Sequence, residues 1–280
     1  PGRIHPIFLQ KNLGSPAKTR NWALNSGFID GKYVVFLDGD DSLEPEYLER
    51  LHMLALQSGA DTVICAYDRV EEKSSRVLCT EMQGFPKMIS LPPKDDTLAF
   101  VNGALWNKLF RSDIALAHRI PDFKVGEDLC YQQAIYRDCS KIACTDEVLI
   151  HYRVREASVI SNTEEQSIRY FAEELARQYE QAKNPSQKDT IGLLAFIHIG
   201  ISMALRAADK SACAFKMDKP LFQEVLRMVL PQPVDASDAV KKTWTEGLGA
   251  VGLQAFIPDR LFPLVFMVLS WSGKMLPCGF

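Results

Sequence analysis

The stretch Gly31-Lys-Tyr-Val-Val-Phe-Leu-Asp-Gly-Asp-Asp-Ser-Leu43 decides the fold of this chain. Residues 34–37 form an uninterrupted apolar run, which is typical of a central parallel strand covered on both faces. The run ends at Asp38, Asp40 and Asp41. Asp38 and Asp40 are two residues apart, so an extended backbone would point both side chains to one side. Carboxylates at the end of a strand in an open α/β sheet suit a hard cation such as Mg²⁺ or Mn²⁺.

A structural interpretation of the same residues stays open. Asp41 or Ser42 could cap the helix that we expect at residues 45–58. A cap uses one carboxylate, whereas residues 38–41, here called the aspartate turn, carry three. We therefore favour a metal site.

Further motifs carry a resemblance to a known enzyme family. Besides the aspartate turn they are Asn12-Leu-Gly-Ser-Pro-Ala-Lys-Thr-Arg-Asn-Trp-Ala-Leu-Asn-Ser-Gly27, Trp106-Asn-Lys-Leu-Phe-Arg111 and Gly126-Glu-Asp-Leu129, followed by His151-Tyr-Arg-Val-Arg155. In this order they resemble the catalytic domain of family 2 glycosyltransferases over about residues 4–160. The resemblance implies an α/β chain with a partial GT-A fold, which is Rossmann-like, with a mostly parallel sheet and flanking helices.

The resemblance also implies an activity. It is the metal-dependent transfer of a sugar from a nucleotide-diphosphate sugar to an acceptor hydroxyl, with inversion at the anomeric carbon. Asp40 would bind Mn²⁺ or Mg²⁺ directly, with Asp38 on the ribose or a metal-bound water and Asp41 assisting, and the ion would offset charge on the departing diphosphate. Asp128, with Glu127 as second choice, would deprotonate the acceptor. Alternatively, both only stabilise a helix start.

Five more residues are expected at the donor. The resemblance places Arg20 and Asn12 at the nucleotide, and a guanidinium suits a phosphate or a base carbonyl. Arg153 and Arg155 lie on one cationic face and are expected to contact the pyrophosphate. Lys108 either neutralises phosphate or pairs with an acid on the surface.

Two ring side chains near these motifs have competing interpretations. Trp106 could stack on a sugar, but its apolar neighbours favour the core. His151 could be a third metal ligand, although imidazole is a less typical ligand of Mg²⁺ than carboxylate is.

Composition limits the possible classes. The 280 residues are 47% hydrophobic and 24% charged, as in ordinary globular proteins, and the formal charge of -3 argues against nucleic-acid binding. The seven cysteines contain no Cys-x-x-Cys pair and predict buried thiols in a reducing compartment. We expect a cytoplasmic protein, or one at the inner face of the cell membrane. Assembly of bacterial surface polysaccharide or another cell-envelope glycan is implied by the resemblance alone.

The chain is expected to have two parts. Residues 1–160 would form the catalytic domain and residues 161–280 an all-helical region. Residues 4–9 predict a strand, but nothing in residues 1–11 resembles the family's first strand and acidic segment, so we expect the amino-terminal strands to be missing. Further expected elements are helices at 16–26, 45–58, 127–138 and from 162 onward, and strands at 60–67, 77–80, 106–110 and, as a pair with a turn at 146–147, 139–150.

The carboxyl-terminal part contains two long apolar stretches. Residues 190–207 predict a packed helix. Residues 261–272 carry no charge, so they either pack on the catalytic domain or lie in a membrane interface, with Trp271 and Lys274 at headgroup level. Peripheral membrane contact through residues 261–275 would suit a lipid-linked sugar acceptor.

Two other classes stay open. The chain could be a non-catalytic or truncated remnant of the fold that lacks a complete donor site. It could also be a metal-dependent phosphohydrolase with an aspartate nucleophile at the strand end, but Glu127 and Asp128 would then have no role.

Overall fold

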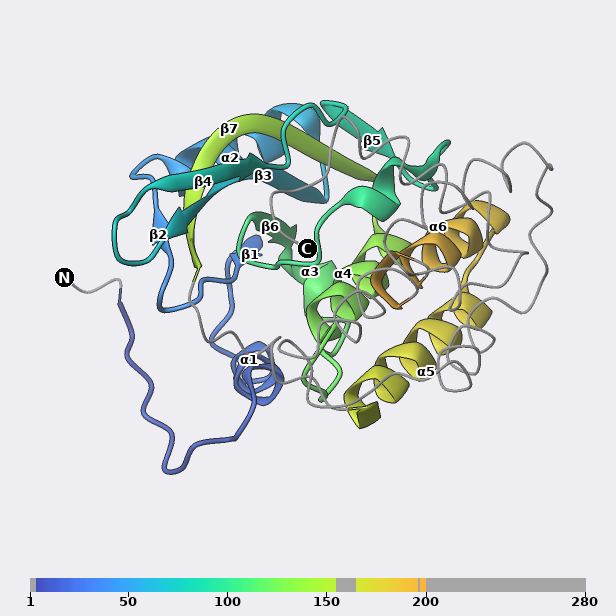
Figure 1. The fold of residues 1–280 in the computed structure, drawn as a ribbon, viewed down its shortest axis with the longest axis horizontal. Coiled ribbons are helices and arrows are strands. Elements are labelled where there is room, and N and C mark those ends of the chain that lie inside the picture. The colour runs from blue at the N-terminus through green and yellow to red at the C-terminus, as the bar shows by residue number, and fades with distance from the viewer. Residues whose placement is uncertain (1–3, 155–164, 196, 200–280) are drawn as a thin grey trace, which may run out of the picture.

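The structure is a computed structural model, and it describes residues 4–154, 165–195 and 197–199. Figure 1 shows a twisted sheet beside a group of helices formed by α4, α5 and α6. The predictions for Arg155, for residues 261–275 and for the later helices fall outside the described residues.

The described strands form one seven-stranded mixed sheet. Its path is β1 (Tyr33–Val35), β6 (Lys108–Arg111), β3 (Thr62–Glu71), β7 (Lys141–Val154) and β2 (Ser42–Leu43), with β4 (Val77–Glu81) on β3 and β5 (Met88–Ser90) on β7. The expected α/β class is confirmed. The sheet is less parallel than expected, because among these strands only β3 and β7 pair in parallel.

β1 differs from the predicted central parallel strand. It spans three residues, ends the path of described strands and pairs antiparallel with β6. β3 was expected beside it but lies one strand away, because Phe110 of β6 stands between Val34 and Thr62. β1 and β3 both run antiparallel to β6 and so share one direction, and α2 (Tyr47–Ser58) crosses between them.

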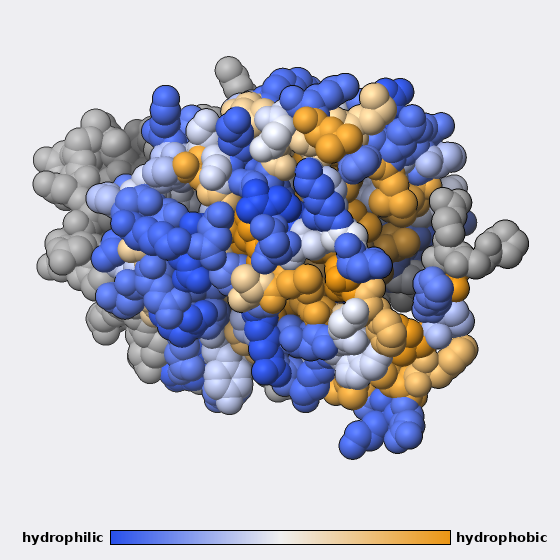
Figure 2. Space-filling model, turned by 180° about the vertical axis from the view of Figure 1, so that it is seen from behind, coloured by the Kyte–Doolittle hydropathy of each residue, from blue (hydrophilic) through white to orange (hydrophobic). Residues whose placement is uncertain are grey.

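The segments before and after β1 carry exposed apolar side chains. Phe28 and Leu37 are 69% and 52% exposed. Residues 4–10 form no strand, contrary to the prediction, because no described strand offers them a partner. Figure 2 shows hydrophobic residues gathered in the middle of the back face and toward one edge.

The helices agree better with the sequence than the strands do. α2 ends at Gly59, whose φ of 65° allows the left-handed cap. α4 (Glu127–Asp138) has the predicted bounds. The other helices are α1 (Pro16–Leu24), the short 3-10 helix η1 (Asp96–Phe100), α3 (Ser112–Ala115), α5 (Glu165–Gln181) and α6 (Pro185–Ala195). No helix in the described part of the chain is both long and apolar enough to span a membrane.

β7 corrects the predicted strand pair at residues 139–150. It is a single strand, and its pairing with β3 shifts so that Cys65 faces Thr145 while Ala66 faces Val148. The two intervening residues, which were expected to form a turn, are absorbed as a bulge.

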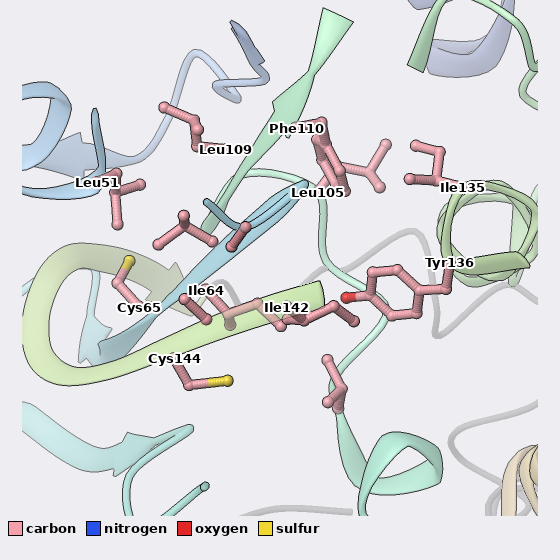
Figure 3. Packing of buried hydrophobic residues seen from close by; sticks show 14 of the residues in the cluster. Leu51, Ile64, Cys65, Leu105, Leu109, Phe110, Ile135, Tyr136, Ile142 and Cys144 are labelled. Atoms are coloured by element: carbon pink, nitrogen blue, oxygen red, sulfur yellow. The ribbon is translucent and has the colours of Figure 1, made fainter. Parts of the chain in front are cut away.

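The core lies between the sheet and helices on both of its faces. Ile64 of β3 and Ile142 of β7 lie side by side, with Leu51 of α2 on one side and Ile135 and Tyr136 of α4 on the other (Figure 3). Each of these five side chains is at most 2% exposed. Burial of an aliphatic side chain such as Ile135 contributes about 1.5–3 kcal/mol, which holds α4 against the sheet.

Gly126, directly before α4, sets how closely α4 approaches α5. Its φ is +84°, and an added Cβ would lie 2.6 Å from the ring of Phe171 on α5. Both the backbone conformation and the space require glycine here.

We expect Gly126→Ala to lower the free energy of unfolding by roughly 2–4 kcal/mol, since it adds left-handed strain and overpacking. Gly27→Ala is the matched control, because Gly27 has a φ of +77° but no atom within 4 Å of an added Cβ. Urea unfolding of both variants measures the difference. Equal losses would show that the contact with Phe171 is unimportant.

Candidate active site

Arg20 joins the aspartate turn to the start of α4. Its Nη2 donates to Asp38 Oδ1 and its Nη1 to Asp128 Oδ1, both at 2.7 Å. The Arg20 side chain is 14% exposed, compared with 40% for Asp38 and 27% for Asp128. Three segments that are distant in the sequence therefore meet at one guanidinium.

The docking of α1 explains why Arg20 reaches this place. Asn21 Nδ2 donates to the carbonyl oxygen of Ile120, and the N–H of Ile120 donates to Asn21 Oδ1, at 2.7 and 2.9 Å. Ser15, which caps α1, donates its hydroxyl to Asp122 Oδ1 at 2.9 Å. These contacts fix α1 on the loop that leads to α4.

Asn12 shapes the loop before α1. Its Oδ1 accepts from the N–H of Gly14 at 2.8 Å, which forms a local side-chain turn. The predicted contact of Asn12 with a nucleotide stays a prediction.

The aspartate turn is a turn and not an extended strand end. The N–H of Asp41 donates to the carbonyl oxygen of Asp38 at 3.2 Å, so the premise that Asp38 and Asp40 project from an extended backbone is wrong. Asp41 Oδ1 accepts from the N–H of Arg153 at 3.1 Å, which ties the turn to the end of β7. Asp41 Oδ2 is buried, and no hydrogen-bond partner for it lies among the described residues.

The charge on Asp41 is unfavourable in this position. Burial, helped by the charges of Asp40 and Asp38 and opposed by the N–H and the charge of Arg153, raises its pKa to about 6. The described residues contain no group of three His, Cys, Asp or Glu side chains that could hold a metal by itself. A Mg²⁺ site completed by substrate phosphates needs only one or two protein carboxylates, and the unpaired oxygen of Asp41 beside Asp40 fits that donor set.

Glu127 and Asp128 form a coupled acidic pair in the first turn of α4. Burial raises the pKa of Glu127 to about 7, helped by the charge of Asp128 and a hydrogen bond to it. Burial also raises the pKa of Asp128, against the opposing charge of Arg20. A carboxyl with a pKa near neutral pH beside a second carboxyl with a raised pKa suits proton transfer.

Lys108 is not on the surface. Its side chain is 0% exposed, and its Nζ donates to Asn102, Ala104 and Asn107. Burial lowers the pKa of Lys108 to about 7. The predicted surface ion pair is wrong, because Lys108 is entirely buried, and a phosphate contact would require this cage to open.

The end of β7 holds two more of the predicted residues. Arg153 is exposed and contributes its backbone N–H to Asp41. His151 Nε2 lies 2.6 Å from Glu44 Oε1, and its Nδ1 lies 3.8 Å from Asp68 Oδ2. His151 thus faces these two carboxylates, which the sequence did not single out because only the pairing of β7 with β2 and β3 brings them together.

Trp106 lies in the core, as favoured. It is 6% exposed and stacks on Tyr152 with ring centroids 5.3 Å apart and planes 7° from parallel. Tyr67 meets it edge-on at 4.6 Å. The indole is therefore covered by other rings and offers no platform for a sugar.

Comparisons with known proteins agree with this architecture. Residues 1–100 match the family model of glycosyl transferase family 2. The S. aureus TarS fragment 1–349 in complex with UDP-GlcNAc has a TM-score of 0.59 and 18% identity, over 95% of this chain and 74% of that one. The same fragment with UDP has a TM-score of 0.60 and 17% identity. Residues 1–100 are therefore similar to family 2 glycosyl transferases, and the fold is similar to the GT-A fold of TarS.

Curated relatives are glycosyltransferases of greater length. Glycosyltransferase GlyA of Streptococcus pneumoniae is 28% identical over 160 residues, which are 54% of this chain and 22% of that protein. Cholesterol galactosyltransferase of Borreliella burgdorferi is 29% identical over 150 residues, which are 49% of this chain and 41% of that protein. The chain thus spans less than half of either relative.

We expect Asp41→Asn to stabilise the metal-free fold by roughly 1 kcal/mol at pH 8, after allowance for solvent screening. Burial raises the folded-state pKa of Asp41 from 3.8 to about 6, so its penalty is absent below the unfolded pKa, builds up between these two values and is fully present above about 6. Melting temperatures at pH 8 and pH 3 measure this, and the gain should vanish at pH 3. Added Mn²⁺ should stabilise the wild type more than the variant, and equal stabilisation would contradict a cation at Asp41.

Proposed function

We propose that this chain provides the catalytic region of a glycosyltransferase. It moves a sugar from a nucleotide-diphosphate sugar to an acceptor hydroxyl, depends on Mn²⁺ or Mg²⁺, and inverts the anomeric carbon. The observation that carries the proposal is the contact of Arg20 with both Asp38 and Asp128. It brings the aspartate turn and the candidate base together. The family match and the TarS fold likeness support it.

Each side chain of the site has a role in this proposal. Asp40 and Asp41 hold the cation, with Asp38 beside them, and the cation supplies positive charge against the departing diphosphate. Asp128 takes the proton of the acceptor hydroxyl, and Glu127 shares that proton at neutral pH. Arg20 keeps Asp38 and Asp128 at a fixed separation.

The relatives and structural neighbours support a proposal for the substrates. A uridine-diphosphate sugar is the proposed donor, because the TarS complexes contain UDP-GlcNAc or UDP. We propose a glycan or lipid-linked sugar as acceptor in bacterial glycan assembly, at the inner face of the cell membrane, with residues 1–160 as the catalytic domain and the remaining residues as a helical region. Asn12, Arg153 and Arg155 are proposed on the donor side.

Asp128→Asn should lower UDP release from UDP-sugars by about 10²–10⁴-fold, since it removes the proton acceptor. Asparagine keeps an oxygen for Arg20, so the melting temperature should change little. Gln83→Ala, at an exposed site on the β4 side, is the control and should retain wild-type turnover. Undiminished turnover by Asp128→Asn would refute its role as base.

Asp40→Asn tests the cation without relying on turnover. Titration calorimetry of the wild type with UDP should show binding that strengthens by roughly tenfold when Mn²⁺ is present, whereas the variant should lose this dependence. Equal UDP affinity of the wild type with and without Mn²⁺ would instead favour the interpretation as a non-catalytic remnant.

The pH profile tests the acidic pair. Because burial raises the pKa of Glu127 to about 7, turnover should rise with pH through neutrality, as the pair loses its shared proton. Glu127→Gln removes this titration, so the acid limb of the turnover profile should shift to lower pH. Its turnover at pH 8 should stay within about fivefold of the wild-type value. Loss of turnover at every pH would identify Glu127 as the base.

A further inference from the structure

Lys108 folds the loop before β6 around itself. Its buried Nζ donates to the carbonyl oxygen and the Oδ1 of Asn102 at 3.0 and 2.8 Å, to the carbonyl oxygen of Ala104 at 2.5 Å and to Asn107 Oδ1 at 2.8 Å. All of these oxygens accept hydrogen bonds and none can donate, so the cage stabilises the ammonium form against the burial that lowers the pKa of Lys108. A buried charge without hydrogen-bond partners is very unfavourable, so the ammonium requires these oxygens to stay in place.

The cage is anchored to the centre of the sheet. The N–H of Cys65 on β3 donates to the carbonyl oxygen of Asn107 at 3.1 Å, and Asn107 Nδ2 donates to the carbonyl oxygen of Cys65 at 3.0 Å. Asn107 therefore connects β3 with Lys108. Residues 102–107, here called the lysine loop, are held from both sides.

The lysine loop also touches α4 beside the candidate base. A Cβ added to Gly103 would lie 3.0 Å from Leu129 Cβ and 3.3 Å from Leu129 Cα. Leu129 follows Asp128 directly and is itself 3% exposed. The loop backbone thus packs against the first turn of α4 with no room for a side chain.

We propose that Lys108 is a positioning residue for the acidic pair. By holding the lysine loop against Leu129, its ammonium fixes where the first turn of α4 presents Glu127 and Asp128. Arg20 contacts Asp128 directly, whereas Lys108 acts through the loop and touches no substrate. This role rests on the proposed function, and it explains why a lysine, and not an apolar residue, occupies an entirely buried position.

The test compares three variants. Lys108→Met keeps the length of the side chain but removes every donor. Gly103→Ala leaves the ammonium in place and pushes a methyl group toward Leu129. Ile89→Ala, on β5 and 6% exposed, is the matched control for lost core packing outside the lysine loop and outside the first turn of α4. The measurements are UDP release from UDP-GlcNAc with Mn²⁺ and amide hydrogen exchange of residues 128–131.

Lys108→Met and Gly103→Ala should lower kcat by about 10- to 100-fold while KM for UDP-GlcNAc stays within about threefold, since a displaced base slows chemistry and not donor binding. Both should speed exchange at residues 128–131 relative to Ile89→Ala. The proposal would be overturned if exchange at residues 128–131 in both variants matched that in Ile89→Ala. A wild-type kcat in Lys108→Met would overturn it as well.

Two outcomes separate this proposal from the proposed function. If the wild type releases no UDP from any UDP-sugar, the proposed function fails, and the exchange measurement still decides whether Lys108 positions α4. If Lys108→Met does not fold, Gly103→Ala decides, and unchanged exchange at residues 128–131 in that variant would overturn the positioning role.

Discussion

The guanidinium of Arg20 bridges Asp38 and Asp128, and the candidate site depends on this interaction. Without it, the partly buried carboxylates of Asp38 and Asp128 would have no cation among the described side chains that contacts both. Burial lowers the pKa of Arg20, but Asp128 and Asp38 more than offset this effect and raise it. The guanidinium therefore stays charged and holds the aspartate turn and α4 at one distance.

The fold supplies the three attachment points of this contact. β1 leads into the aspartate turn, which the backbone of β7 holds through Asp41. α1 is fixed by the paired hydrogen bonds between Asn21 and Ile120. α4 is fixed by its apolar face in the core and by Gly126 against α5. Each attachment is local, and only their combination brings Arg20 to both carboxylates.

The sequence predicted what is encoded locally. The bounds of α4 and the end of α2 at Gly59 follow from apolar spacing and a glycine cap. The position of β6 between β1 and β3 was missed, because the choice of neighbouring strand depends on contacts far apart in sequence. Lys108 was misplaced for a related reason: a lysine is normally exposed, and only its apolar neighbours Leu109 and Phe110 signalled a buried strand.

The carboxyls of the site differ from those of ordinary ion pairs in this protein. A hydrogen bond from Arg111 lowers the pKa of Asp113, and one from Lys87 lowers that of Asp146, so these pairs favour the charged form. At the site burial outweighs the partners, and the pKa values of Asp41, Glu127 and Asp128 are raised. Carboxyls kept in an unfavourable state are stabilised when a ligand brings positive charge or a proton to accept. This contrast, and not the number of acids, distinguishes the candidate site from a surface that is merely acidic.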